Sequence, residues 1–374
     1  MRGRGKQANT TPQLGLWSFI AQNRLNWLLL FLPVSMLLHF AGVAQLWVFF
    51  TSALAIVPLA GLIGRATEEI AESTGPALGG LLNATFGNAT ELIIALLALR
   101  AGLDEVVKAS ISGSIIGNIL LVLGLSMFVG GWGRDKQRFS RTNAGASASM
   151  LMLAVVALVM PAVFDLTMYG SLNAPPPGSP LPLLSLLVAI VLILIYLASL
   201  IFSLRTHRML FAPPGPARPH AELSRRNAVL LLSITTVLVA LESELLVSSI
   251  EAATSALHMT KFFVGVIVVA VIGNAAEHFS AVSMARKDKM DLAMTIATAS
   301  STQIALFVAP VLVFASFLFG TPMTLVFNPF EIVGIALSVL LLSVVSLDGE
   351  SNWFEGLQLV AVYLVFGIVF YFVR

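Results

Sequence analysis

The residues of this chain that could do chemistry stand in two short motifs of the same pattern. The sequence GNATE forms the first motif (87–91) and GNAAE forms the second motif (273–277). Extended to fourteen residues, GNATELIIALLALR and GNAAEHFSAVSMAR share six identities, among them Gly, Asn, Glu and the closing Arg. Each motif ends in a carboxylate, Glu91 or Glu277, within a long apolar run. A carboxylate in such a place must be neutralised by a cation or a proton.

Oxygen atoms around the two carboxylates could complete a cation site. Gly and Asn tolerate distorted backbone, so each motif could break its helix and free carbonyl groups, as discontinuous transporter helices do. Carboxylates, carboxamides and freed carbonyls would form an all-oxygen cage, which suits hard cations and Ca²⁺ in particular. The predicted cation ligands are Glu91, Glu277, Asn88 and Asn274, together with Gly87, Ala89 and Gly273.

The same two carboxylates could couple the cation to protons. Nearby carboxylates in a low dielectric tend to bind protons when no cation is present, and Ca²⁺ favours their ionised forms. A site that holds either Ca²⁺ or protons becomes an exchanger once it opens alternately to the two sides of a membrane. A single intramembrane Glu also fits a purely structural hydrogen bond, but two copies in matched motifs make that interpretation much weaker.

Composition places these motifs in a membrane protein. Apolar residues make up 57% of the 374 residues and charged residues 11%, with a mean hydropathy of +0.93. A soluble domain carries about 25% charged residues, so a soluble enzyme, a nucleic-acid binder and a disordered chain are excluded. The chain has no cysteine, which excludes disulfides, thiolate zinc sites and iron–sulfur clusters.

Eleven apolar runs approach the length of about 20 residues that a membrane-spanning helix needs. They lie near 26–43, 45–72, 78–100, 107–130, 145–165, 181–204, 227–257, 261–285, 292–319, 329–347 and 353–373. The N-terminus lacks a small-residue cleavage site, so we expect the first run to be a retained helix. With the N-terminus inside, seventeen Lys and Arg fall on inner segments and four on outer ones, as the positive-inside rule requires. The sequence therefore predicts an all-α polytopic membrane protein with eleven spans, N-in and C-out.

The matched motifs imply an internal repeat. They lie in spans 3 and 8, so spans 2–6 correspond to spans 7–11, and span 1 is extra. Because five is an odd number, the second copy crosses the membrane in the opposite sense, which is a signature of transporters. The predicted parts are an N-terminal segment with the peripheral helix (1–44), the first five-helix repeat (45–204), a Pro-rich cytoplasmic linker (205–226) and the second five-helix repeat (227–374).

Other polar residues near the motifs have two interpretations each. Two further glutamates flank the motif helices and fit a cation pathway, although the one beside Arg65 equally fits a solvated ion pair. Intramembrane Ser, Asn and Gln side chains either support the bound cation or link helices by hydrogen bonds, and the His after the second motif either relays protons or is structural. These predicted pathway or supporting residues are Glu68, Glu244, Ser114, Asn118, Ser300, Gln303 and His278.

At these residues the chain resembles the calcium/proton exchanger family of the calcium/cation antiporter superfamily. The segment GGLLNATFGNATELI (79–93) resembles the first signature repeat of that family, and GNAAEH (273–278) resembles the second. The resemblance extends from about residue 45 to the end of the chain. It implies an exchanger fold with one peripheral helix and two inverted five-helix repeats. It also implies Ca²⁺ efflux or sequestration driven by protons, with Glu91 and Glu277 as the central ligands.

The linker departs from the family pattern. Family members often carry an acidic stretch between the halves, whereas residues 205–226 hold Glu222 against five Arg. We therefore do not expect an acidic stretch to gather cations in this chain.

The predicted function is secondary-active Ca²⁺:H⁺ antiport without a cofactor, in a lipid bilayer and without nucleic acid. The alternatives are a Na⁺- or K⁺-coupled Ca²⁺ exchanger, or an exchanger for another divalent cation such as Mn²⁺. A channel is disfavoured because channel filters are usually built by rotational symmetry, and an enzyme because no nucleophile–base pair is evident. The compact loops favour a prokaryotic inner membrane, with an organellar membrane as the alternative.

Overall fold

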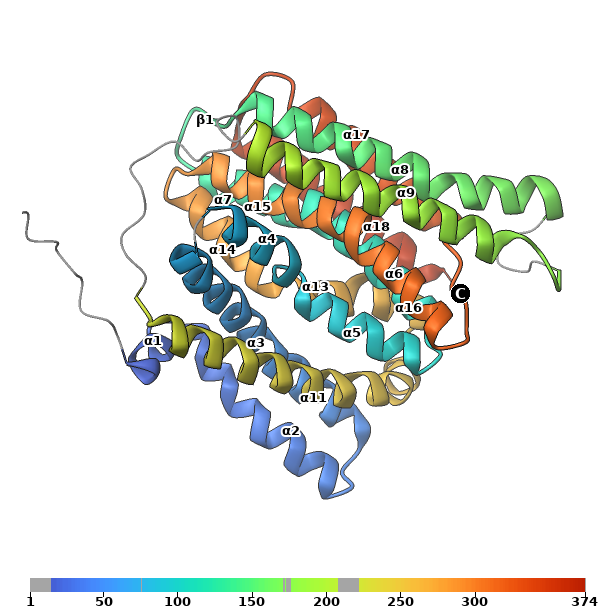
Figure 1. Cartoon of the computed structure of the whole chain (residues 1–374), viewed down its shortest axis with the longest axis horizontal. Coiled ribbons are helices and arrows are strands. Elements are labelled where there is room, and N and C mark those ends of the chain that lie inside the picture. Colours follow the sequence, from blue (N-terminus) through green and yellow to red (C-terminus); the bar gives the residue numbers. More distant parts are fainter. Residues whose placement is uncertain (1–14, 75, 171, 173–175, 208–221, 374) are drawn as a thin grey trace, which may run out of the picture.

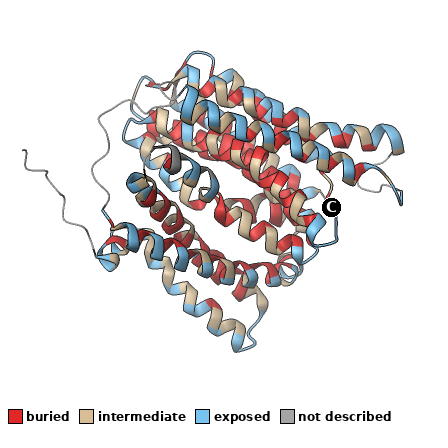
Figure 2. Ribbon diagram, in the orientation of Figure 1, coloured by how far each residue is buried: buried red, intermediate tan, exposed pale blue. Residues whose placement is uncertain are grey.

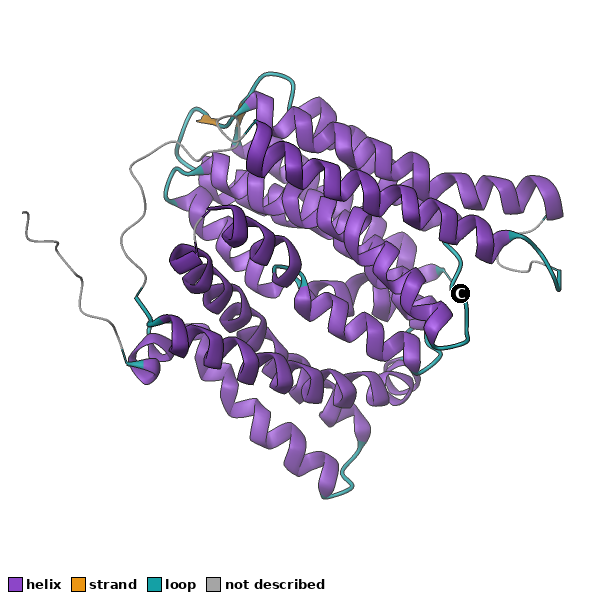
Figure 3. Ribbon diagram, in the orientation of Figure 1, coloured by secondary structure: helices purple, strands orange, loops and turns teal. Residues whose placement is uncertain are grey.

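The computed structural model describes residues 15–74, 76–170, 172, 176–207 and 222–373 of the chain. Most of these residues are helical, and the helices run side by side in one bundle (Figure 1, Figure 3). One short antiparallel pair, β1 (Gln137–Arg138) with β2 (Glu350–Ser351), joins two loops at one end of the bundle. Arg2, Arg4 and Lys6 at the N-terminus and most of the predicted linker lie outside the described residues.

The first half starts with the short helices α1 (Leu16–Ala21), η1 (Arg24–Leu30) and α2 (Phe31–Phe40). The long helix α3 (Gln45–Thr74) precedes the broken pair α4 (Pro76–Phe86) and α5 (Ala89–Arg100). Next, α6 (Asp104–Ile116) continues through the π-helix η2 (Gly117–Val122) into α7 (Leu123–Gly131). The half ends with α8 (Arg141–Tyr169), α9 (Leu181–Ile201) and the π-helix η3 (Phe202–Thr206).

The second half follows a similar order. It begins with the long helix α11 (Arg225–Leu257). The broken helix comprises α12 (Lys261–Phe263), the π-helix η4 (Val264–Val269), α13 (Ala270–Gly273) and α14 (Ala275–Arg286). Next, α15 (Met290–Gln303) continues through the π-helix η5 (Ile304–Val308) into α16 (Ala309–Leu318), and α17 (Pro329–Val345) and α18 (Trp353–Phe372) complete the bundle.

Short sequence signals fix several helix ends. The side chains of Ser140 and Ser224 cap α8 and α11 by accepting hydrogen bonds from the exposed first-turn amides. Asn328 and Asn352 start α17 and α18 with capping boxes, each closed by a Glu three residues later. Gly170, with φ of +71°, terminates α8 in the left-handed conformation that glycine adopts without strain.

A helical segment lies at each of the eleven predicted spans. Among the described residues, seven helices are long and apolar enough to cross a membrane, and the bent pair Lys261–Gly273 and Ala275–Arg286 would make an eighth. Two further apolar helices, Arg24–Phe40 and Pro329–Val345, are shorter than the usual span. The chain is thus a helical multi-pass membrane protein, and the count of eleven spans stays a prediction. Figure 2 shows buried residues on the inward faces of the helices and exposed residues on their outer faces.

Contacts between loops agree with the predicted sidedness. The β1–β2 pair joins two loops that were both predicted inside. At the opposite end, the Lys108 ammonium donates to the Val326 carbonyl at 2.9 Å, and both residues were predicted outside. In Figure 1, α1 and β1 lie at one end of the bundle and the C-terminus towards the other. We call these ends the inner and outer ends.

The helices α2, α3 and α11 form a distinct layer. Leu59 and Ile63 on α3 pack with Leu231 and Val239 on α11 in an apolar cluster that is separate from the main core. Figure 1 shows the three helices together along the lower edge of the bundle. The peripheral helix α2 is attached by a buried polar contact, in which the Ser35 hydroxyl lies 2.8 Å from each carboxyl oxygen of Glu242.

Two helices of the main core cross at very short range. A Cβ atom on Gly113 of α6 would lie 2.1 Å from the Val266 carbonyl oxygen of η4, whereas a Cβ atom on Gly145 of α8 would meet nothing within 4 Å. The crossing of α6 and η4 therefore requires glycine at position 113.

Gly113→Ala is expected to separate α6 from η4 and to destabilise the fold by about 2 kcal/mol or more, as overpacking does. Thermal unfolding of the purified protein in detergent would measure the loss as a lower melting temperature. Gly145→Ala is the matched control and should leave the midpoint unchanged or raise it slightly, because alanine favours the helix over glycine and meets no neighbour there. Equal melting temperatures for the two variants would refute the close crossing.

Candidate cation site

Both motifs break their helices as predicted. In the first motif, α4 ends at Phe86 and α5 begins at Ala89, with Asn88 at φ −106° and ψ 29° between them. In the second motif, α13 and α14 meet at Asn274, with φ −92° and ψ 7°, and the helix bends by 59°. Each break starts a new helix whose first turn carries the carboxylate of its motif. A helix N-terminus favours negative charge, so the breaks help to hold both groups within the bundle.

The two breaks bring Glu91 and Glu277 together. Both carboxylates line one cavity of about 580 Å³ and lie close enough for their charges to interact. The motifs also touch, because a Cβ atom on Gly273 would lie 3.1 Å from Cγ of Glu91. The Oε2 atom of each Glu is buried without a hydrogen-bond partner among the described residues. A buried polar atom normally has a partner, so these two oxygens are suited to receive a cation or a proton.

The motif asparagines bind the opposite half of the chain. The Asn274 carboxamide donates to the Ser114 hydroxyl at 2.8 Å, and the Ser300 hydroxyl donates to Oδ1 of Asn88 at 2.9 Å. Ser114 and Ser300 stand at the same position counted from the glycine of their own motif. The hydrogen bonds therefore cross between the halves in a matching pattern.

Two more predicted residues complete this network. Asn118 donates to Oδ1 of Asn274 at 3.1 Å and to the Ser300 hydroxyl at 3.0 Å, while Gln303 accepts a hydrogen bond from the Asn88 carboxamide. The oxygen atoms of both motif asparagines are thus engaged in hydrogen bonds between helices. This geometry favours a positioning role for the asparagines, with the carboxylates as the groups that face the cavity.

The backbone positions predicted as ligands divide between two environments. Gly87 and Gly273 line the cavity beside the carboxylates. Ala89 is buried in the apolar cluster of α3 and α11 and is not among the cavity-lining residues.

The remaining predicted residues are Glu68, Glu244 and His278, and only one of them lines the cavity. Glu68 lines the cavity towards its inner end, beside Arg65. Glu244 lies on an exposed face of α11, and neither it nor His278 lines the cavity. The structure therefore brings Glu68 to the cavity and leaves Glu244 and His278 away from it.

Several polar groups of this cavity were not predicted from the sequence. Asn83 on α4 and Ser280 and Ser283 on α14 line it. Ser280 and Ser283 follow Glu277 at intervals of three residues, which is the spacing of one helix face, so this signal was available. The π-helix η2 begins within one turn of Ser114 and contains Asn118, and the π-helix η5 begins directly after Gln303. Neither sequence, GNILLV or IALFV, carries a signal that distinguishes a π-helical turn from an α-helical one, so the π-helices were not predictable. Such π-helical turns often occur at functional sites.

The wide access to the carboxylates is from one end of the bundle. From them the cavity extends to Asn23, Asn26 and Arg65 at the inner end. Towards the outer end, Glu91 borders only a void of about 10 Å³ that Ser110 also lines. That volume is at the lower limit for a single water, so the wide opening of the site is on the inner side and the outer side is nearly closed.

The two broken helices differ in a way that accounts for this opening. Gly79 of α4 faces α3, where its added Cβ would lie 2.8 Å from Cβ of Ala71. Gly265 holds the equivalent position before the second motif but faces α6, at 2.7 Å from Cβ of Ala109. The half-helix η4 thus closes over the outer side, while α4 leans towards α3 on the inner side.

These features define a class of protein. Two matching sets of apolar helices, each with a broken helix that carries a carboxylate to a shared central cavity, are the architecture of a secondary transporter. Residues 44–205 and 227–372 match the family model described as sodium/calcium exchanger protein, and the chain belongs to this family.

Individual relatives agree over nearly the whole chain. A protein of Aphanothece halophytica named Ca(2+)/H(+) antiporter is 48% identical over 360 residues, which is 92% of this chain and 95% of the relative. The Ca(2+)/H(+) antiporter ChaA of Bacillus subtilis is 46% identical and covers 84% of this chain and 89% of its own length. The solved structure of native YfkE superposes with a TM-score of 0.80 at 39% identity, covering 96% of this chain and 100% of that one. The predicted exchanger fold and family are confirmed.

Asn118→Ala should weaken the crossed network. It removes one donor from two buried acceptors, which costs about 1–3 kcal/mol when they stay unsatisfied. The melting temperature in detergent should fall accordingly. Gln358→Ala, which truncates an exposed amide on α18, should have no effect, and an equal response of both variants would contradict the network.

Proposed function

We propose that this chain is a secondary-active Ca²⁺:H⁺ antiporter that exports or sequesters Ca²⁺ against inward proton flow. The observation that carries this function is the pair Glu91 and Glu277, which two matching broken helices place in one cavity that is open at a single end. Relatives of nearly full length at 46–48% identity are named Ca(2+)/H(+) antiporters. The chain is a multi-pass integral membrane protein, and its bacterial relatives support a plasma-membrane location.

The two glutamates are proposed to hold either Ca²⁺ or protons. With Ca²⁺ bound, the unpartnered oxygens would act as ligands, together with cavity-lining carbonyl groups of the motifs. Without Ca²⁺, two adjacent carboxylates in a low dielectric would be neutralised by protons. An empty and ionised pair is the costly state, so the site would return across the membrane only when it is loaded with one or the other.

Alternating access follows from the difference between the two broken helices. In the inner-open state described above, η4 packs on α6 and α4 packs on α3. We infer that the outer-open state exchanges these arrangements, with α4 moving over the inner side of the site and η4 moving away from α6. The matched positions of Gly79 and Gly265 support this exchange, because each half-helix has a glycine where it makes its close contact.

The decisive experiment uses purified protein in sealed liposomes with a pH step as the only driving force. Calcium-45 flux and a pH dye inside the liposomes are followed together, without Na⁺ or K⁺ and then with each. Uphill Ca²⁺ movement with opposite proton movement supports the antiporter. If transport requires Na⁺ or K⁺, that ion and not the proton is the coupling ion. Downhill Ca²⁺ flux without proton counterflow would indicate a channel. The same assay with Mn²⁺ in place of Ca²⁺ tests cation preference.

Glu91→Gln and Glu277→Gln should each abolish Ca²⁺-driven proton movement while leaving the folded protein in the membrane. The amide keeps the shape of the side chain but neither ionises nor neutralises a divalent cation. Glu251→Gln is the matched control, because Glu251 is an exposed partner of Lys261, and it should transport normally. Exchange at the unmodified rate by either site variant would overturn the assignment of the pair.

Protons should compete with Ca²⁺ at the inner side. Lowering the pH loads the pair with protons, so the apparent KM for Ca²⁺ should rise by up to about ten-fold per pH unit for each competing proton. Initial rates of Ca²⁺ flux over a range of pH on the inner side would measure this. A KM that is constant with pH, or that falls as the pH is lowered, would contradict a shared site.

A further inference from the structure

The strongest feature outside the cation cavity is a pocket at the inner end between α7 and α14. It has a volume of about 670 Å³ and is lined by apolar, aromatic and basic residues: Phe128, Val129, Trp132, Gly133, Arg134 and Arg286. In the sequence, the basic loops here indicate topology alone. The structure brings basic residues of two of these loops into one pocket, and this arrangement needs an explanation of its own.

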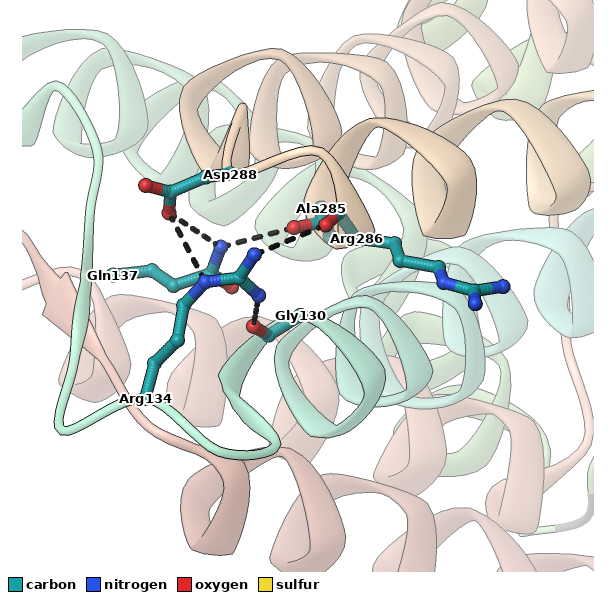
Figure 4. A network of polar contacts seen from close by, with 6 residues as sticks. All are labelled: Gly130, Arg134, Gln137, Ala285, Arg286 and Asp288. Carbon is teal, nitrogen blue, oxygen red and sulfur yellow. Dashed lines mark hydrogen bonds and ion pairs between the residues drawn. The ribbon is translucent and has the colours of Figure 1, made fainter.

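Arg134 is held in place by the protein. Its guanidinium donates to the carbonyl oxygens of Gly130 and Arg286, and its Nε lies 3.9 Å from the Asp288 carboxylate. Gln137 belongs to the same network, because its side-chain amide donates to the Asp288 carboxylate at 2.9 Å (Figure 4). A guanidinium has five N–H donors, so one N–H on each terminal nitrogen of Arg134 remains available.

Arg286 is a second cation without a protein partner. Its guanidinium makes no hydrogen bond or ion pair with the described residues, and Figure 4 shows the side chain extending away from the Arg134 network. The two arginines therefore offer planar, multi-donor binding, which suits the oxygens of a phosphate group.

The aromatic side of the pocket is typical of a position at the membrane surface. The Trp132 ring is 66% exposed and packs edge-on against Phe128 and Trp353, at 5.5 and 5.9 Å between centroids. Exposed tryptophans concentrate at the level of lipid headgroups. A free phosphate in solution would use the arginines but not the apolar side chains of Phe128 and Val129.

We propose that this pocket binds one anionic phospholipid of the inner leaflet. Its phosphate would bind the free N–H groups of Arg134, and the exposed Arg286 side chain would turn towards it from the other side of the pocket. Its glycerol and upper acyl chain would lie on Trp132, Phe128 and Val129. The bound lipid would then join the end of α7 to the end of α14, the helix whose first turn carries Glu277. This inference goes beyond the proposed function and does not depend on which cations are exchanged.

The test measures quenching of tryptophan fluorescence by brominated lipid. The protein is reconstituted in phosphatidylcholine containing a small fraction of dibrominated phosphatidylglycerol or, in parallel, dibrominated phosphatidylcholine. Wild type should be quenched preferentially by the anionic lipid. Arg286→Gln should reduce that preference by about five-fold, which corresponds to one cation near a charged headgroup. Lys287→Gln is the matched control, because it removes the same charge from an exposed neighbour that does not line the pocket.

Other outcomes would overturn the proposal. Equal quenching by both lipids, or an equal loss in Arg286→Gln and Lys287→Gln, would mean that general surface charge attracts the lipid. The chain with both Trp132→Phe and Trp353→Phe retains the two arginines and should lose the preferential quenching, since both tryptophans at the pocket are removed. If it keeps the preference, the lipid binds elsewhere. Complete competition by inorganic phosphate would assign the pocket to a soluble anion and exclude the lipid.

Discussion

The rest of the structure depends on the cost of holding two carboxylates in an apolar interior. Glu91 and Glu277 lie in the first turns of α5 and α14, and neither forms an ion pair with a cationic side chain of the described residues. Ionised together and alone, they would be strongly unfavourable. The broken helices, the helix N-termini beside the carboxylates and the close approach of Gly273 to Glu91 all serve to keep the pair in place. The same free-energy cost of two buried charges favours the binding of a cation that neutralises both carboxylates.

Neutral hydrogen bonds give the site its shape. The crossed contacts of Asn88 with Ser300 and of Asn274 with Ser114 join the two halves without adding charge. Displacement of a broken helix disturbs the contact of its own asparagine, and Asn118, which donates to both Asn274 and Ser300, links the two contacts. The network therefore connects the carboxylates to the half-helices α4 and η4, which lie on the inner and outer sides of the cavity. Binding or release of a cation at the carboxylates could move these helices through it.

Much of this arrangement could be predicted from the sequence, because polar residues are rare and conspicuous in apolar runs. The positions of the helical segments, the breaks at the motifs and the meeting of Glu91 with Glu277 required only the motif repeat and the apolar pattern. The packing of α4 against α3 could not be predicted, because α4 has the same local sequence whether it packs against α3 or over the site. Nor could the buried contact between Ser35 and Glu242, which depends on the rotation of two helices about their axes. Whether Glu244 and His278 contribute to the pathway remains a prediction that the inner-open arrangement does not test.

The unequal volumes on the two sides of Glu91 have a consequence for the solvent. At about 30 Å³ per molecule, the inner cavity of about 580 Å³ holds on the order of twenty waters, whereas the outer void of about 10 Å³ holds one at most. A void of that size cannot hold a file of water molecules, so it restricts the leak of protons from the carboxylates to the outer side. Closing the inner cavity must also expel its water. The conformational equilibrium therefore includes an osmotic work term, and solutes too large to enter the cavity favour the closed state.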